Sequence, residues 1–336
     1  MHSEKYIINW LNISIGFLLM MIFVGGITRL TDSGLSMVSW KPVTGIFPPV
    51  NEEQWVDSFD TYKDFPEYKV TNYNISISDY KYIYIWEYIH RMLGRLIGLL
   101  FFIPFSYFLI KGYLSRKLVP KLIFIFILGG FQGFLGWYMV KSGLIDNPHV
   151  SHYRLASHLL LAFIILGLVY KIKLSLIMKT ENKILNYNYY KNFINIISAM
   201  LYFQIIYGAF NAGLKTVSTI NTFPFYEGAI LPPDLLILKP LYLNIFENHL
   251  SVQFIHRSFA VIILILVSIF SYRLSFIKSK VNIYTQYFLL IVFLQMMLGV
   301  LTLVANAPLF FASSHQMMAA LLIMLSFKIK HMLGYE

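Results

Sequence analysis

Eight long apolar runs constrain this chain more than any other feature of its sequence. Each is about 20 residues long, the length that an α-helix needs to cross the hydrocarbon core of a bilayer. They lie near 8–27, 84–110, 120–140, 150–170, 190–210, 250–272, 283–304 and 308–327. Only 13% of the residues are charged, against about 25% in soluble domains. The sequence therefore predicts an all-α integral membrane protein with eight transmembrane helices.

The basic residues gather in alternate connectors between these runs. They cluster within 111–121, within 171–191, within 273–280 and in the tail after residue 327. Basic connectors stay on the cytoplasmic or matrix side, so both termini are expected inside, in a bacterial or a mitochondrial inner membrane. The outward connectors are then 28–83, 141–149, 211–248 and 305–307. The net charge of +11 thus follows from membrane topology, and no nucleic-acid partner is expected.

The first outward connector, 28–83, carries a stretch with helical periodicity. Trp55, Phe59 and Tyr62 recur at three- and four-residue spacing, which places them on one helix face. A short interfacial helix is expected there, with Trp and Tyr at the level of the lipid headgroups. This connector and 211–248 are long and rich in proline, aromatics and asparagine, so function is expected on the outer side.

The two halves of the chain repeat each other with an offset of about 160 residues. The segment EYIHR, ending at Arg91, aligns with QFIHR, ending at Arg257. Further matches are Gln132 and Gly136 with Gln295 and Gly299, and Ser157-His158 with Ser314-His315. Matched runs cross the membrane in the same direction. We therefore expect two pseudo-symmetric four-helix bundles, an N-terminal one in 1–180 and a C-terminal one in 181–336.

Four histidines lie inside the apolar runs, where an ionisable side chain is costly and marks a candidate site. They are His90, His158, His256 and His315, each six to eight residues from the outer end of its run. All four then share a depth of roughly 9 to 12 Å. A lone membrane histidine often bonds a neighbouring helix, but two repeated pairs at one level favour heme iron, whose common axial ligand is imidazole. The repeat pairs His90 with His158 and His256 with His315; zinc or copper would need additional ligands.

Two further histidines compete as ligands. His249 precedes His256 by seven positions and shares its helix face, and His152 lies six positions before His158 on a different face. Both are expected at the outer rim, near heme propionates or water. The repeat favours His256 because Ile83 occupies the position that matches His249, although His249 stays open as a ligand.

An acidic residue distinguishes the two halves. Glu87 lies three positions before His90 and shares its face, whereas Gln253 holds the matching position in the second half. A buried acid in one half suggests proton handling or stabilisation of a cationic intermediate. The structural alternative is an ion pair with Arg91 or Arg95.

Two arginines directly follow a predicted ligand in the repeat. Arg91 and Arg257 suit the carboxylates of heme propionates near the outer rim, and snorkelling towards the headgroups is the alternative. The chain has no cysteine, which excludes disulfides, iron–sulfur clusters and thiolate metal sites.

Several segments together resemble the heme A synthase family, in its mitochondrial and alphaproteobacterial type. They are GGITRLTDSGLSMVSWKPVTGIFPP, EYIHRMLGR, QGFLGWYMVKSGL, NAGLKT with NTFP, VQFIHR and SSHQMMAALL, in this order over nearly the whole chain. The resemblance implies oxidation of the C8 methyl group of heme O to the formyl group of heme A, the cofactor of terminal cytochrome c oxidases.

The resemblance also implies roles for the candidate residues. His90 and His158 would receive the substrate heme, with Glu87 in catalysis, while His256 and His315 would hold a heme b. Some bacterial members carry a cysteine pair in the outer loops, so the absence of cysteine here excludes a thiol relay. Heme O is then the expected partner, with an electron donor, a heme O synthase and a homo-oligomer as further possibilities.

Two other classes of protein remain as alternatives. A diheme electron-transfer cytochrome b would carry permanent heme b in both halves. A transporter would also explain the repeat, but transporter repeats usually flank helices broken at mid-membrane, whereas the glycine and proline breaks here lie mostly at the ends of runs.

Overall fold

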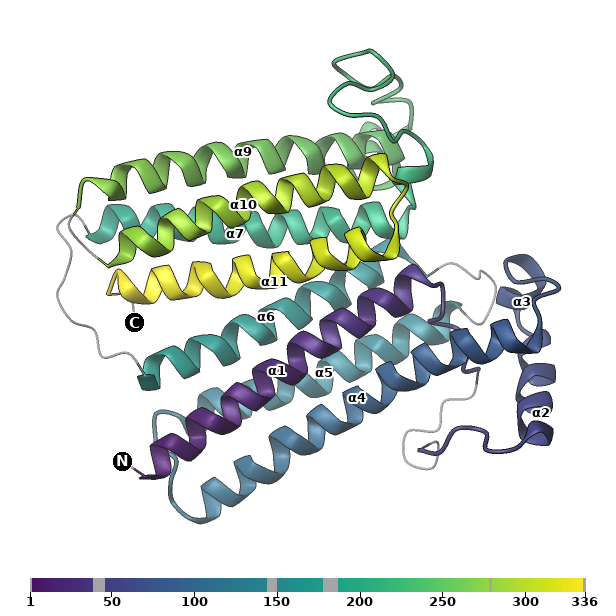
Figure 1. The fold of residues 1–336 in the computed structure, drawn as a ribbon, viewed down its shortest axis with the longest axis horizontal. Helices are drawn as coiled ribbons and strands as arrows, with labels where there is room; N and C mark the ends of the chain where they lie inside the picture. Colours follow the sequence, from purple (N-terminus) through teal and green to yellow (C-terminus); the bar gives the residue numbers. More distant parts are fainter. Residues whose placement is uncertain (1, 39–45, 144–149, 178–186, 278–279, 335–336) are drawn as a thin grey trace. The chain divides into compact units, whose positions relative to one another are not determined.

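The computed structural model describes residues 2–38, 46–143, 150–177, 187–277 and 280–334 (Figure 1). Eight of its helices are long and apolar enough to cross a membrane. They are α1 (His2–Leu30), α4 (Ile77–Ile110), α5 (Val119–Gly143), α6 (His152–Ile177), α7 (Tyr187–Gly213), α9 (His249–Ser275), α10 (Val281–Val304) and α11 (Leu309–Met332). The described residues also form the short helices α2 (Glu52–Lys63), α3 (Pro66–Val70), η1 (Thr216–Ser218), η2 (Leu241–Leu243) and α8 (Asn244–Glu247). The predicted all-α membrane protein with eight transmembrane helices is confirmed.

The chain divides into two compact units, which are described separately. The smaller unit is Gly16–Arg154, and the larger unit comprises Met1–Ile15 and Leu155–Glu336. The predicted boundary between residues 180 and 181 lies outside the described residues. The division into two pseudo-symmetric halves therefore stays a prediction.

The larger unit contains a closed bundle of four helices. Around the bundle, α7 packs on α9, α9 on α10, α10 on α11, and α11 on α7 (Figure 1). Its core includes Phe270 of α9, Phe288 of α10 and Ile323 of α11, all fully buried. The order of packing makes α9 and α11 diagonal neighbours, and likewise α7 and α10. Side chains that point inward from α9 and α11 therefore face each other across the bundle axis.

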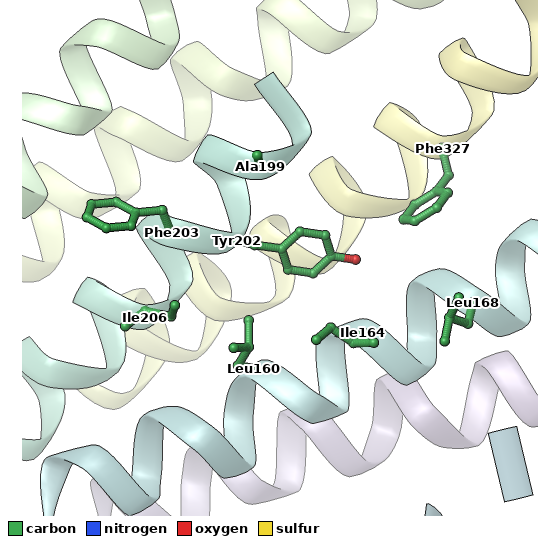
Figure 2. A pocket seen from close by; sticks show the side chains of 8 residues that line it. All are labelled: Leu160, Ile164, Leu168, Ala199, Tyr202, Phe203, Ile206 and Phe327. Atoms are coloured by element: carbon green, nitrogen blue, oxygen red, sulfur yellow. The ribbon is translucent and has the colours of Figure 1, made fainter. Parts of the chain in front are cut away.

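Helix α6 packs against this bundle beside an apolar groove of about 540 Å³. Figure 2 shows leucine and isoleucine side chains of α6 facing Tyr202 of α7 and Phe327 of α11. Gly167 permits the close approach at one point of this contact. A methyl group on Gly167 would lie 2.6 Å from Cε2 of Phe327 and 2.8 Å from the hydroxyl oxygen of Tyr202. The missing side chain of Gly167 thus sets the distance between α6 and its neighbours.

In the smaller unit, the predicted helix in the first outward connector is α2, and its aromatic face is turned inward. Phe59 and Tyr62 are buried against α4, and each ring lies 5.0 Å from that of Tyr80. Tyr62 donates a hydrogen bond of 3.0 Å to Glu67; burial, and then the nearby Glu67 carboxylate, raise the pKa of this phenol. The helix was correctly predicted, and the level of its Trp and Tyr side chains relative to the headgroups stays a prediction. Phe59 and Tyr62 pack on α4, where their rings bury apolar area.

The contact at Gly167 predicts the effect of adding one methyl group. Gly167→Ala should destabilise the larger unit by about 1–3 kcal/mol, the usual cost of overpacking a filled interior. Thermal unfolding in detergent, followed by circular dichroism, measures the effect. Gly129→Ala in α5 is the matched control, because a methyl group there has no atom within 4 Å. Equal melting temperatures for the two variants would contradict the packing described.

Candidate functional site

Three of the four predicted histidines lie against a glycine of a neighbouring helix. The pairs are Gly25 of α1 with His90 of α4, Gly208 of α7 with His256 of α9, and Gly299 of α10 with His315 of α11. Each imidazole fills the space that a side chain would otherwise take. The rings are therefore held against backbone inside their units, not turned towards lipid.

His315 is fixed by the helix that it touches. Its Nδ1 lies 3.0 Å from the carbonyl oxygen of Gln295, which accepts a hydrogen bond, so Nδ1 carries the proton. In neutral imidazole the lone pair is then on Nε2, the usual arrangement of a histidine that ligates a metal. The ring reaches this carbonyl because Gly299, four residues on, has no side chain to cover it: a methyl group would lie 2.9 Å from Cε1.

His256 also lies against a glycine and beside a glutamine, but its ring is less tightly packed and its Nδ1 is not fixed by a carbonyl. The side-chain amide of Gln204 donates to the carbonyl oxygen of His256 at 2.9 Å, and its nitrogen lies 3.4 Å from Nε2 of the ring. A methyl group on Gly208 would lie 3.3 Å from Cε1. The buried Nδ1 of His256 and the amide oxygens of Gln204 and Gln295 have no hydrogen-bond partner among the described residues.

The two rings come from α9 and α11, which are diagonal neighbours in the bundle. Each ring lies against a glycine and within 3.4 Å of a glutamine amide that is only partly satisfied. Two imidazoles held in this way suit the binding of a heme iron. Among the described residues there is no group of three or more His, Asp or Glu that would hold a bare metal ion. The donor set therefore fits heme.

Arg257, the residue after His256 in α9, reaches Tyr226 in the connector between α7 and α9. Its three guanidinium nitrogens are buried and have no hydrogen-bond partner among the described residues, while the guanidinium carbon lies 4.3 Å from the centre of the Tyr226 ring. A buried guanidinium with donors to spare favours an anionic ligand.

A tight turn in the connector between α7 and α9 places Tyr226 over Arg257. Tyr226 and Ala229 exchange backbone hydrogen bonds of 2.8 and 3.0 Å. The two central residues, Glu227 and Gly228, have φ of 51° and 93°, which is the pattern of a type I′ turn. Burial raises the pKa of Tyr226, and the neighbouring Arg257 opposes that shift.

Glu87 is the centre of a buried network in the smaller unit. Glu87 is only 2% exposed. Its Oε2 accepts hydrogen bonds from the Ser36 hydroxyl at 2.7 Å and from the Met37 backbone N–H at 2.8 Å. Oε1 accepts from Arg91 at 2.5 Å, and Arg91 also donates to the Met37 carbonyl at 2.9 Å. The ion pair that the sequence left open with Arg91 is thus present. The network joins the segment after α1, which contains Ser36 and Met37, to α4, and Glu87 lies one helical turn before His90.

The remaining histidines are placed as follows. His158 lies in α6, which belongs to the larger unit, while His90 belongs to the smaller one, so their pairing stays a prediction. His249 is the exposed first residue of α9, with Nδ1 3.5 Å from the Thr219 hydroxyl. His152 is the first residue of α6, and its ring lies 4.0 Å from that of Tyr153. Both therefore lie at the N-terminal ends of their helices, and their expected place at an outer rim near heme propionates or water stays a prediction.

Several residues of the site were not among the predicted ones. The glutamines that contact His256 and His315, Gln204 and Gln295, each precede a glycine by four residues, and Gln132 and Gly136 have the same spacing. This spacing is a signal in the sequence for a helix that receives a histidine. Tyr226 and Ser36 have no comparable signal, because they lie in connectors between helices, where no helical spacing marks the residues that contact the site.

Comparison with known proteins agrees with the resemblance seen in the sequence. The family described as cytochrome oxidase assembly protein matches residues 8–327. A heme A synthase of Ehrlichia canis (strain Jake) is 45% identical over 96% of this chain and 91% of its own length. Those of Wolbachia pipientis wMel and Nitrosospira multiformis are 44% and 42% identical, over 95% and 98% of this chain and 90% and 93% of their own lengths. The chain therefore belongs to the heme A synthase family of cytochrome oxidase assembly proteins.

Proposed function

We propose that this chain oxidises the C8 methyl group of heme O to the formyl group of heme A, with a substrate half and a cofactor half. The substrate half uses His90, His158 and Glu87; the cofactor half holds heme b on His256 and His315. The observation that carries the proposal is the pair of glycine-backed imidazoles from diagonal helices, in a chain of this family. The protein would lie in a bacterial or a mitochondrial inner membrane, with both termini inside.

The C-terminal bundle is suited to hold a permanent heme. Bound there, heme b would supply one-electron transfer towards the substrate half. Nδ1 of His315 donates to the Gln295 carbonyl, which fixes the ring and leaves Nε2 for iron. The Gln204 and Gln295 amides, each 3.4 Å from an Nε2, would move aside when iron takes that position.

Arg257 would bind a propionate of this heme. Its unpartnered guanidinium nitrogens are the donors that a carboxylate requires. Tyr226 covers the guanidinium from the other side, so the cation stays desolvated and its attraction for a carboxylate is strengthened.

Glu87 would act in the substrate half through its charge. Three donors, from Arg91, Ser36 and Met37, favour the ionised carboxylate. Taking up a proton would displace one of them, so electrostatic stabilisation of positive charge near the reacting methyl group fits this geometry better than proton transfer. Arg91, held by Glu87 and Met37, would bind a propionate only if this network opened.

A diheme electron-transfer cytochrome b is the second candidate. It has the same histidines but requires no acid at one site, and the contrast between Glu87 and Gln253 favours the enzyme. The electron donor and a heme O synthase would be partners of the enzyme, and heme O its substrate.

Identifying the hemes in the purified protein tests the proposed function. After co-expression with a heme O synthase, the wild-type protein should contain heme A or partly oxidised forms of heme O, found by mass spectrometry of the extracted hemes. Glu87→Gln should lower conversion by about 10²-fold or more while heme b is retained, and exposed Glu53→Gln should convert normally. Heme b alone in the wild-type protein would support the cytochrome, and unchanged conversion by Glu87→Gln would withdraw the role of Glu87.

The glycine contacts predict graded effects on the C-terminal heme. Gly299→Ala should displace His315, because the methyl group would lie 2.9 Å from its ring. The expected result is a changed low-spin electron paramagnetic resonance spectrum and a lower heme b content. Gly208→Ala, at 3.3 Å, should change both less, and Gly129→Ala should change neither. A wild-type spectrum from Gly299→Ala would contradict ligation by His315.

Loss of the Arg257 charge should shift the potential of heme b. A cation near a propionate favours the reduced heme, so Arg257→Gln should lower the midpoint potential by several tens of millivolts. Redox titration followed by visible absorption measures the shift. Arg273→Gln is the matched control, since Arg273 lies in the last turn of the same helix and donates to Tyr189. Equal potentials in the two variants would exclude a propionate contact at Arg257.

A further inference from the structure

The connector between α7 and α9 carries an apolar surface outside the transmembrane helices. Residues 229–246, here called the apolar segment, contain only two charged residues, Asp234 and Lys239. Seven of its large apolar side chains are 40–79% exposed. They are Ile230, Leu231, Leu236, Ile237, Leu241, Tyr242 and Ile245. Water would penalise such a surface, so this segment requires an apolar environment.

The polar side chains of the same region point inward. Asn244 is fully buried; it accepts from the Leu238 backbone N–H at 3.0 Å and donates to the carbonyls of Leu238 and Leu241 at 2.9 Å each. Asn248, 6% exposed, donates to the Asp234 carbonyl at 2.8 Å. The Ser251 hydroxyl donates to the carbonyl of Leu235.

These bonds satisfy backbone groups of the segment from inside the protein. Burial of asparagine beneath exposed leucine, isoleucine and tyrosine is the reverse of the pattern on a water-facing surface. Internal pairing of backbone groups is what a lipid environment demands, because lipid chains offer no hydrogen bonds.

The segment also adjoins the membrane directly. Helix α8 ends at Glu247, and Asn248 is the N-cap of the transmembrane helix α9, accepting from the N–H groups of Leu250 and Ser251. In Figure 1 the connector stands beside the N-terminal end of α9 and the C-terminal end of α10. The apolar segment therefore leads directly into a helix with an exposed apolar surface of its own. Val261 and Ile265 of α9 are 48% and 52% exposed.

We propose that the apolar segment lies in the outer leaflet of the bilayer, with its exposed side chains at the boundary between headgroups and acyl chains. Tyr242 suits the headgroup level, as aromatic residues do at membrane interfaces, and Asp234 and Lys239 would reach water. The partner is the lipid surface itself. Anchored there, the connector would hold its other arm, which carries Tyr226, over Arg257.

Fluorescent probes at single cysteines test this placement, and the cysteine-free chain makes the labelling specific. Leu236→Cys and Tyr242→Cys, labelled with an environment-sensitive nitrobenzoxadiazole probe, are reconstituted in phosphatidylcholine–phosphatidylglycerol vesicles. Both probes should emit at short wavelength, be quenched by spin-labelled lipids and resist iodide. Ile265→Cys in α9 is the lipid-facing reference, and Glu53→Cys in α2 is the water-facing one.

Two results would overturn the proposal. Iodide quenching of Leu236→Cys and Tyr242→Cys as strong as that of Glu53→Cys would place the segment in water. Short-wavelength emission without quenching by spin-labelled lipids would place it against protein, in a second copy of the chain or another partner. Because both substitutions are at exposed positions, they leave the buried hydrogen bonds of Asn244 and Asn248 intact.

Discussion

The rest of this structure depends on one constraint: inside a bilayer, a polar group must find its partner within the protein. The histidines meet it by lying against helix backbone that glycine leaves bare. His315 shows the device most fully, since Gly299 opens the Gln295 carbonyl to the imidazole and the carbonyl fixes which nitrogen keeps its lone pair. A ring placed in this way is both buried and oriented, and these are the two properties that an axial ligand of heme needs.

At one matched position the two halves pair a buried polar side chain with backbone in opposite ways: Glu87 accepts hydrogen bonds, and Gln253 donates them. Three residues before the histidine, Glu87 accepts hydrogen bonds from Ser36 and Met37, just after α1. At the matching position Gln253 donates to the carbonyls of Thr216 and Ile220, just after α7. Each side chain therefore joins the connector after the preceding long helix to the helix that carries the histidine. Only the first of these fastenings contains a charge, and that charge requires Arg91 as its counterion.

The sequence alone predicted the transmembrane helices and singled out the histidines, because run length, hydropathy and the internal repeat can be recognised without the tertiary structure. The contacts of those histidines required the fold. Gln295 and Gly299 were visible as matches in the repeat, but their hold on His315 depends on how α10 meets α11. Tyr226 reaches Arg257 through a type I′ turn, and Phe59 and Tyr62 turn inward because Tyr80 offers a ring to pack against. The path of a connector and the choice of a ring's packing partner depend on tertiary structure, which the periodicity of the sequence does not encode.

The difference between Glu87 and Gln253 bears on why one half would transform its heme and the other keep it. The neutral Gln253 amide adds a dipole but no net charge, so a heme held in that half would be governed mainly by its ligands and by Arg257. A buried ion pair adds charges of its own. If Arg91 turned to a substrate carboxylate, the Glu87 charge would be left uncompensated in the helix turn that precedes His90. In a medium of low dielectric constant that charge would act strongly on positive charge developing at a nearby carbon. On this reasoning, substrate binding itself would switch on the electrostatic part of the reaction.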